Sequence, residues 1–448
     1  MWGAGYRLTS DDLDNTLFAA FLPEERTDET FRLFIQDEIG LWSDRLLLTG
    51  SLRADRSSNN VQIDKWFYYP KVAGSYRFPV SAGLLDDVKF RAAWGQAGLQ
   101  PQYGQKFNNL NPGSIGGLQT LALGNTTAAG DLRPERQTEI EAGADVTLFG
   151  SRAQLEATVF QKTVNDLLLQ RVPAPSTGFA LEIFNGGQMQ VRGLELALLA
   201  SPVQTDAFGW VSRTTFYADR SEITELPVPA FEVGGFGTGL GAFRIEQGKS
   251  ATQIVGTVGV DEDGNDIVET LGDATPDFRM NFSNDLTFGP FALRSLFDWA
   301  HGSSAINLTR LLADAGQNTV DYATGVAACP GFFDNDDNPI EMGAGECRIS
   351  TAFGLGDIRP YIEGTGYIKL RDLTLEYAIP AAALERLVGG SIVSANVSLS
   401  GRDLYTWTDY TGVDPEVSNF GNQPIARNID VAPYPPSRSF WLTVQVTF

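Results

Sequence analysis

The last nine residues of the chain, FWLTVQVTF, alternate strictly, and this pattern narrowly limits what the chain can fold into. Every second residue from Phe440 to Phe448 is apolar, and the residues between them are Trp, Thr, Gln and Thr. A period of two is that of a β-strand, whose successive side chains point to opposite faces of a sheet. The sequence therefore predicts a strand with an apolar environment on one face and a more polar one on the other.

The same alternation recurs along the whole chain. It is clear in LLLTGSLRAD (46–55), EIEAGADVTLF (139–149), DFRMNFSNDLTF (277–288) and SIVSANVSLSGR (391–402), where apolar or small residues alternate with polar and charged ones. We predict about thirteen such strands, over residues 30–41, 44–56, 66–78, 87–97, 138–149, 152–164, 188–200, 209–220, 277–288, 291–300, 367–379, 391–403 and 437–448.

The connections between the predicted strands alternate in length. Short connections fall at 42–43, 79–86, 150–151, 201–208, 289–290 and 380–390. Long ones fall at 98–137, 165–187, 221–276, 301–366 and 404–436, with 57–65 as a mild exception. A soluble sandwich has no reason to place its long loops at one end. An outer-membrane barrel has short periplasmic turns and long extracellular loops.

A lipid bilayer explains the alternation and the connections together. Lipid cannot satisfy backbone N–H and C=O groups, so only helices and closed barrels span it. The apolar runs in this chain are too short for a membrane-spanning helix. We therefore predict an all-β fold, an antiparallel up-and-down transmembrane β-barrel, of which this chain supplies about thirteen strands. For the final strand taken alone, the alternative is a buried edge strand of a soluble β-domain.

The composition argues against two broad classes of function. Asp and Glu number 55 against 33 Lys and Arg, and the resulting net charge of -22 argues against nucleic acid as a partner. The single histidine, His301, and the four methionines leave little for metal chemistry or for acid–base catalysis near neutral pH. No Ser/His/Asp pattern accompanies His301, so we expect that the chain is not an enzyme.

Several stretches resemble one known family. DLRPERQTEIEAGADVTLFGSRAQLEATVFQKTVNDLL (131–168) resembles a strand pair of TonB-dependent receptors. LGDATPDFRMNFSNDLTF (271–288), YIEGTGYIKLRDLTLEYAIP (361–380) and SLSGRDLYTWTDYTGVDPEVS (398–418) resemble motifs of the SusC/RagA branch of that family. Similar patches run from about residue 31 to the end of the chain, where YPPSRSFWLTVQVTF looks like the family's last strand.

The resemblance implies a function and a set of partners. It implies part of a TonB-dependent transporter in the cell outer membrane of a Gram-negative-type bacterium, importing an oligosaccharide, a peptide or a similar large solute. The implied partners are the lipid bilayer, the TonB–ExbB–ExbD system, a SusD-like lipoprotein, and the outer-membrane assembly machinery, which would read the terminal Phe448. The alternative function is a soluble or surface all-β carbohydrate-binding protein, which would remain monomeric without detergent.

The chain also departs from the family. Family members are longer and carry a signal peptide, a TonB box and a plug domain, whereas MWGAGYRLTSDDLDN has neither a basic nor an apolar signal region. An odd number of strands is also unusual. We therefore expect a fragment: residues 1–29 as an extracellular loop or the remnant of an upstream strand, and residues 30–448 as the C-terminal portion of the barrel. The strand edge at 31–41 is expected to be unpaired unless the sheet closes prematurely or this edge meets strand 437–448.

Aromatic residues cluster at the ends of predicted strands. Barrels place aromatic girdles at both membrane interfaces, and exposed aromatic rings also stack on sugars. We expect one of these two roles for Trp66, Tyr68, Trp299, Tyr405, Trp407 and Tyr410. On the strand at 87–97, Lys89 and Arg91 alternate with apolar residues, which places both charges in the barrel lumen.

The two cysteines, Cys329 and Cys347, lie in the long connection 301–366. We expect a disulfide between them, because the extracellular face is oxidising and a bridge would restrain this loop. Their Cα atoms would then lie roughly 4.4–6.8 Å apart. The alternative is a pair of free thiols far from each other.

Two acidic segments, DEDGND (261–266) and DNDDN (334–338), raise the question of calcium. Clustered carboxylates are the ligands that Ca²⁺ prefers, but neither segment has the Gly and Glu spacing of an EF-hand. We favour solvated acidic loops over Ca²⁺ sites, and we expect no cofactor.

Overall fold

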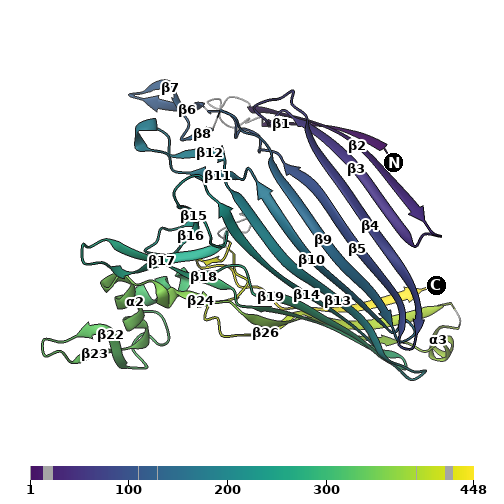
Figure 1. Ribbon diagram of the computed structural model, residues 1–448. Helices are drawn as coiled ribbons and strands as arrows, with labels where there is room; N and C mark the ends of the chain where they lie inside the picture. The colour runs from purple at the N-terminus through teal and green to yellow at the C-terminus, as the bar shows by residue number, and fades with distance from the viewer. Residues whose placement is uncertain (1, 14–23, 109, 129, 390, 419–426) are drawn as a thin grey trace.

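Fourteen antiparallel strands form one continuous sheet in the computed structural model of the chain, which describes residues 2–13, 24–108, 110–128, 130–389, 391–418 and 427–448. Each strand pairs with its neighbours in the chain order, and the sheet curves like part of a barrel wall (Figure 1). Across the sheet the strands are β1 (Trp2–Leu13), β2 (Glu24–Leu41), β3 (Leu46–Ser57), β4 (Phe67–Ala82), β5 (Leu85–Leu99), β9 (Glu135–Leu148), β10 (Ala153–Asn165), β13 (Gln188–Gln204), β14 (Phe208–Glu225), β19 (Phe278–Phe288), β20 (Phe291–His301), β25 (Tyr367–Ala378), β26 (Ser394–Thr408) and β28 (Ser439–Thr447).

This arrangement confirms the predicted all-β, antiparallel, up-and-down topology. All thirteen predicted strands are present, and the sheet has a fourteenth strand, β1, within residues 1–29, for which we expected an extracellular loop or the remnant of an upstream strand. The prediction of a free edge at 31–41 is therefore wrong for residues 31–35, which pair with residues 2–6 of β1. Only the first half of WGAGYRLTSDDL alternates in polarity, so the strand gave a weak signal.

The two ends of the sheet are β1 and β28. Among the described residues, β28 pairs with β26 on one side and no strand is paired to its other side. The expectation that the last strand meets the first strand of this chain is therefore not met.

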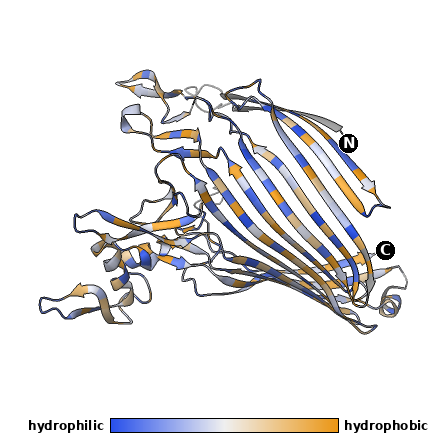
Figure 2. Cartoon of the chain, in the orientation of Figure 1, coloured by the Kyte–Doolittle hydropathy of each residue, from blue (hydrophilic) through white to orange (hydrophobic). Residues whose placement is uncertain are grey.

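The strand register places apolar residues on one continuous face. At mid-height, directly paired residues run across eight strands in the order Ile39, Leu48, Gly74, Ala92, Ala142, Val159, Leu194 and Ala218. The neighbouring row, on the opposite face, contains Glu38, Thr49, Glu141 and Asp219. The alternation is visible along the coloured strands at the front of the sheet in Figure 2.

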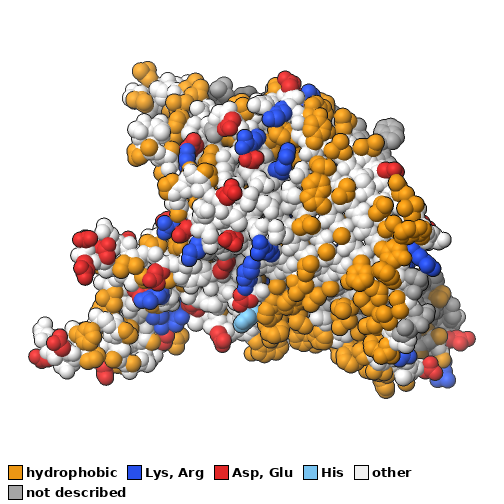
Figure 3. Space-filling model, in the orientation of Figure 1, with side chains coloured by type: hydrophobic (Ala, Val, Ile, Leu, Met, Phe, Trp, Pro, Cys, Tyr) orange, Lys and Arg blue, Asp and Glu red, His pale blue; other side chains and the backbone are white. Residues whose placement is uncertain are grey.

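Much of this apolar face is uncovered by the chain itself. Leu399 and Leu442, which are paired across β26 and β28, are 55% and 71% exposed. Figure 3 shows apolar side chains gathered over the part of the sheet nearer the short turns, and charged side chains nearer the long loops. An apolar surface of this extent requires a non-aqueous environment, as the outside of a membrane barrel does.

The connections sort to the two ends of the sheet, as the sequence predicted. The short ones are residues 42–45, 83–84, 149–152, 205–207, 289–290 and 379–393, the last containing helix α3 (Ala381–Val388). The long ones are residues 58–66, 100–134, 166–187, 226–277, 302–366 and 409–438. The described helices are short, and none of them is long and apolar enough to cross a membrane.

The long connections fold into small sheets of their own. These are β6 (Leu110–Ile115) with β7 (Leu118–Leu123); β8 (Thr126–Ala128) with β12 (Leu181–Asn185) and β11 (Leu168–Arg171); β15 (Phe231–Gly235), β16 (Ala242–Ile245), β17 (Gln253–Val260) and β18 (Asp266–Asp273); β21 (Ser304–Asn307) with β24 (Ile362–Gly364) and β27 (Ile429–Asp430); and β22 (Ala327–Phe333) with β23 (Pro339–Met342). Helices α1 (Leu308–Ala315) and α2 (Ala344–Gly354) and the 3₁₀ turns η1 (Pro175–Thr177) and η2 (Arg359–Tyr361) complete them.

The principal hydrophobic core lies in these loops and not in the sheet. Phe243, Ile254, Ile306, Tyr361 and Ile429 are buried together and come from three long connections, 226–277, 302–366 and 409–438. Arg348 of α2 supports this core, because it bonds both Asp314 and Asp321 at 2.8–2.9 Å. The loop end of the sheet is therefore a packed structure that can hold side chains in fixed positions.

Candidate functional site

Most of the aromatic residues singled out from the sequence lie on the apolar face, at the loop end of their strands. Trp299 and Trp407 both pair with Ile368, and the ring of Tyr405 lies 4.6 Å from that of Trp407, between centroids. Tyr68 pairs with Ala54 on the same face. Trp66 precedes β4 and is half-buried, with the Arg56 guanidinium 5.5 Å from its ring.

Tyr410 is different, and the prediction does not hold for it. Its side chain is only 6% exposed, and its hydroxyl donates to the Asp430 carboxylate at 2.6 Å. Burial raises the pKa of the Tyr410 phenol, and the hydrogen bond to Asp430 raises it further. Tyr410 packs with Ala305 and Val417 inside the loops, so it offers no face to lipid or to a ligand.

The remaining sequence-derived residues have identifiable surroundings. Cys329 and Cys347 are joined by a disulfide, with Cα atoms 5.6 Å apart, and the bond ties β22 to α2. Lys89 and Arg91 lie on the polar face and share the carboxylate of Asp145, at 3.0 and 3.1 Å. His301 ends β20, with its ring 5.6 Å from Phe278.

Both acidic segments form exposed hairpin turns. The Asp261 carboxylate accepts from the backbone N–H groups of Asp263 and Asn265, and Asp334 makes the same bonds with Asp336 and Asn338. These bonds hold the pKa of both carboxyls below the ordinary value. Among the residues that the structure describes, no group of three or more His, Cys, Asp or Glu side chains is arranged to hold a metal ion.

A cavity of about 510 Å³ lies on the polar face, where the strands meet the long loops. The strand register builds its floor, because Tyr217 pairs with Arg279, Arg279 with Ala300, and Ala300 with Tyr367. The small side chain of Ala300 leaves space between Arg279 and Tyr367. All four residues line the cavity.

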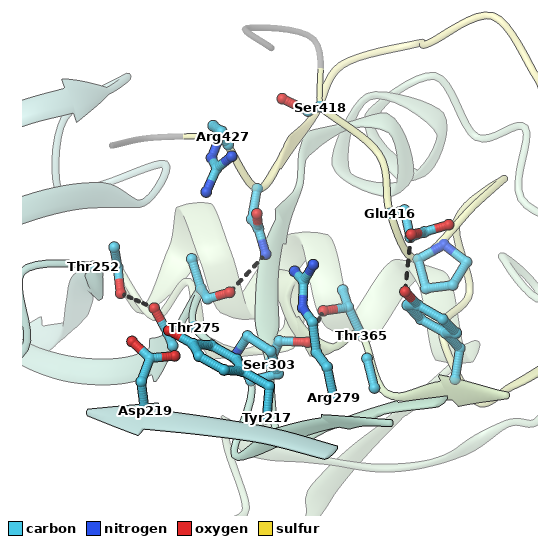
Figure 4. Close-up of a pocket in the computed structure, with 16 residues that line it drawn as sticks. Tyr217, Asp219, Thr252, Thr275, Arg279, Ser303, Thr365, Glu416, Ser418 and Arg427 are labelled. Carbon is cyan, nitrogen blue, oxygen red and sulfur yellow. Dashed lines mark hydrogen bonds between the residues drawn. The ribbon is translucent and has the colours of Figure 1, made fainter. Parts of the chain in front are cut away.

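The walls of the cavity come from three loops and are rich in hydroxyl groups (Figure 4). Thr252 and Thr275 are hydrogen-bonded to each other at 2.7 Å, and Thr365 donates to Ser303 at 2.8 Å. Asn428 fixes the third loop, because its amide donates to the backbone carbonyls of Ala274 and Ser304 at 3.2 and 3.1 Å.

An ion-pair cluster anchors the wall that contains Glu416. Lys369 is 4% exposed, and its Nζ lies 2.7 Å from Asp414 and 2.5 Å from Glu416. Glu416 also binds Arg371 at 2.5 Å and accepts from the Tyr367 hydroxyl at 2.8 Å. Burial by itself raises the pKa of Glu416, but the bonds from Arg371 and Lys369 outweigh it and lower the pKa to about 2.

Two arginines, Arg279 and Arg427, line the cavity. The side chains of Arg279 and Arg427 make no hydrogen bond or ion pair with any described residue, and both are exposed. In Figure 4 their guanidinium groups approach the cavity from opposite sides. Of the two acids that line the cavity, Glu416 belongs to the cluster just described, and Asp219 forms no ion pair with a described residue.

Arg279 lies on the polar face predicted for residues 277–288, but the sequence alone did not identify Arg279, Tyr217 or Arg427 as candidate binding residues. What distinguishes these residues is their shared cavity and the lack of partners for the arginines. Neither property is visible before the strands and loops are placed.

The chain is similar in sequence to the members of one known protein family. The model of the family described as TonB dependent receptor-like, beta-barrel matches residues 1–397. The chain is 26% identical over 458 residues to a TonB-dependent receptor of Formosa agariphila, covering 91% of this chain and 45% of that protein. It is 23% identical over 442 residues to the TonB-dependent receptor SusC of Bacteroides thetaiotaomicron, covering 90% of this chain and 42% of that protein.

The fold is also similar to a solved structure, that of the RagAB peptide transporter. The TM-score is 0.76 at 21% sequence identity, and the match covers 97% of this chain and 49% of that one. The chain thus spans about half the length of the relatives it matches.

Proposed function

Because the chain belongs to the TonB-dependent receptor β-barrel family, we propose that it forms part of the wall of an outer-membrane transporter that imports a large solute. An oligosaccharide or a peptide is the solute class that we propose. The role of the chain is to supply a lipid-facing surface, a polar lumen and a solute-binding cavity. We assign it no catalytic role.

The observation that carries this proposal is the separation of the two faces of the fourteen-stranded sheet. One face presents a continuous apolar surface, and the other carries ion pairs such as Lys89–Asp145 and opens into the cavity at the loop end. A sheet with this polarity can stand between lipid and a water-filled lumen. The cavity lies where the lumen meets the long loops, which is the place for a first contact with solute.

The partners follow from the family and are part of the proposal. A TonB–ExbB–ExbD system would supply energy to the assembled receptor, and a SusD-like lipoprotein would cover the loop end. The assembly machinery of the outer membrane would insert the barrel, with the terminal strand β28 as its recognition element. Import by the assembled receptor would then be an energised process, whereas the strands described here only shape the path.

The test is solute uptake by cells that produce the complete receptor. Deleting the gene should abolish uptake of its solute, complementation should restore it, and inactivating TonB should abolish it again. A mixture of fluorescent oligosaccharides and a mixture of fluorescent peptides would identify the class. Uptake that survives the deletion, or that continues without TonB, would contradict the proposal.

A soluble carbohydrate-binding protein is the competing function, and fractionation distinguishes the two. The exposed apolar rows of the sheet predict that the receptor sediments with outer membranes and needs detergent for extraction. A monomer that stays in aqueous solution without detergent would favour the competing function.

A further inference from the structure

We infer that the cavity floored by Tyr217, Arg279 and Tyr367 binds an anionic group, a carboxylate or a sulfate, of an oligosaccharide that the transporter imports. The inference rests on the proposed transport function and narrows its substrate class. It comes from the two arginines that face this cavity.

The chain offers many carboxylates with which an arginine could pair. Its acidic residues exceed its basic ones by 22, the difference between 55 and 33, so anionic partners are abundant. Arg220, one residue past the cavity residue Asp219, pairs with Asp277, and Arg371, which bonds Glu416 of the cavity wall, pairs with three carboxylates. Arg279 and Arg427 have no such partner among the described residues, although both border the polar cavity.

Each of the two arginines is held on a well-supported backbone. Arg279 lies within β19, which is paired on both sides, with β14 and β20. Arg427 precedes β27, which pairs in parallel with β21, and the Asn428 amide clamps the same segment to Ala274 and Ser304. Sites held in this way lose little conformational freedom when a ligand binds.

The guanidinium group sets the chemistry of the ligand. Its planar fork of donors matches the oxygens of a carboxylate, and charged hydrogen bonds of this kind are about twice as strong as neutral ones. Two arginines that approach from opposite sides can contact one anionic group from both sides. Of the two acids that line the cavity, Glu416 is already bonded to Lys369 and Arg371, and Asp219 forms no ion pair with either arginine.

The other lining groups favour a sugar over a peptide. The Tyr217 side chain is 39% exposed, and its ring stacks on Phe160 with the two planes only 16° apart, which offers a supported aromatic face to a sugar ring. Hydroxyl groups of Thr252, Ser303 and Thr365 surround it. A peptide bound as an added strand needs an open strand edge, but the strands that floor the cavity are paired on both sides. The volume of about 510 Å³ falls within the range of ligand sites.

The experiment measures binding to the complete receptor, purified in detergent, by isothermal titration calorimetry. The probes are an oligogalacturonate, its neutral methyl ester, a sulfated galactan oligosaccharide and an acidic peptide of glutamates. The variants are Arg279→Met and Arg427→Met, with Arg279→Lys as the conservative change. Arg213→Met is the matched control, because Arg213 lies on the same polar face of β14 but outside the cavity.

We expect at least one anionic oligosaccharide to bind ten-fold or more tightly than the neutral ester. Arg279→Met and Arg427→Met should each remove most of this difference, Arg279→Lys should remove part of it, and Arg213→Met should leave it unchanged. Preference for the galacturonate identifies a carboxylate, and preference for the sulfated probe identifies a sulfate.

Equal affinity for anionic and neutral probes, or anionic binding unaffected by both Met variants, would overturn the inference. Tighter binding of the glutamate peptide than of either anionic sugar would overturn it as well. Heat-modifiable gel mobility checks that each variant is folded. TonB-dependent uptake of a neutral solute would leave the transport function intact while removing this inference, so the two failures can be told apart.

Discussion

Replacing Lys369 with Met should release the cavity wall that contains Glu416. The Lys369 side chain is buried between Asp414 and Glu416, at 2.7 and 2.5 Å, and Met keeps most of its volume but removes its charge. The carboxylates of Asp414 and Glu416 then face each other without the positive charge of Lys369. The wall segment is held to β25 mainly through this cluster, so the change should act locally.

The expected size of the effect follows from burial. Removing one partner of a buried ion pair costs roughly 3–5 kcal/mol. The lower end, about 3 kcal/mol, applies here, because Glu416 keeps its bond to Arg371 and its side chain is 35% exposed. A change of about 3 kcal/mol multiplies the population of the opened wall by roughly a hundred.

Hydrogen exchange followed by mass spectrometry measures this opening. The amides of Glu416 and Val417, which donate to Asp414, should exchange roughly a hundredfold faster in the Lys369→Met receptor. Lys71→Met is the control, because Lys71 is exposed on the polar face of β4 and forms no ion pair with a described residue. Unchanged exchange in Lys369→Met would refute the reasoning that the cluster holds the wall.

Three further predictions concern the loops and the apolar face. Replacing Cys329 and Cys347 together with Ser should destabilise the β22–β23–α2 unit by about 3 kcal/mol, seen as faster local exchange while the large sheet is unaffected. The hydrogen bond from Arg348 lowers the pKa of Asp321 from 3.8 to about 2, so its stabilisation is present above pH 3.8 and is lost as the pH falls through about 2. Pepsin cleavage near α2 should therefore rise over this interval in the native receptor, and Asp321→Asn should abolish that dependence. Val159→Lys, on the apolar face, should cost about 2–4 kcal/mol in folding into lipid vesicles, whereas no loss would contradict its lipid-facing position.

The strands could be predicted because lipid on one face and water on the other require successive residues to alternate in polarity. Residues such as Leu442 and Thr443 must differ in polarity when lipid lies on one side and water on the other. Strand β1 escaped detection because residues 9–12, TSDD, are four polar residues in succession and show no alternation. In that region only backbone pairing with β2 defines the strand, and backbone pairing does not require a particular sequence pattern.

The cavity was not predictable for a different reason. Tyr217 and Arg279 become neighbours through the register between β14 and β19, which are separated by the long connection 226–277. Arg427 reaches the same space only because β27 joins β21. Tyr410 was predicted to be an interface or ligand-stacking residue because it continues the aromatic pattern of Tyr405. It is buried instead, because it lies beyond the end of β26, where the chain turns inward.

The central claim is that one face of the sheet meets lipid and the other meets a water-filled lumen. Spin labels on single cysteines at Ala142 and Ala144, and at Glu139 and Glu141, test it directly in the receptor in outer membranes. These four positions lie on β9, the first two on the apolar face and the last two on the polar face. We predict high oxygen accessibility at the first pair and high accessibility to a water-soluble nickel complex at the second. Equal nickel accessibility at all four positions would contradict the account.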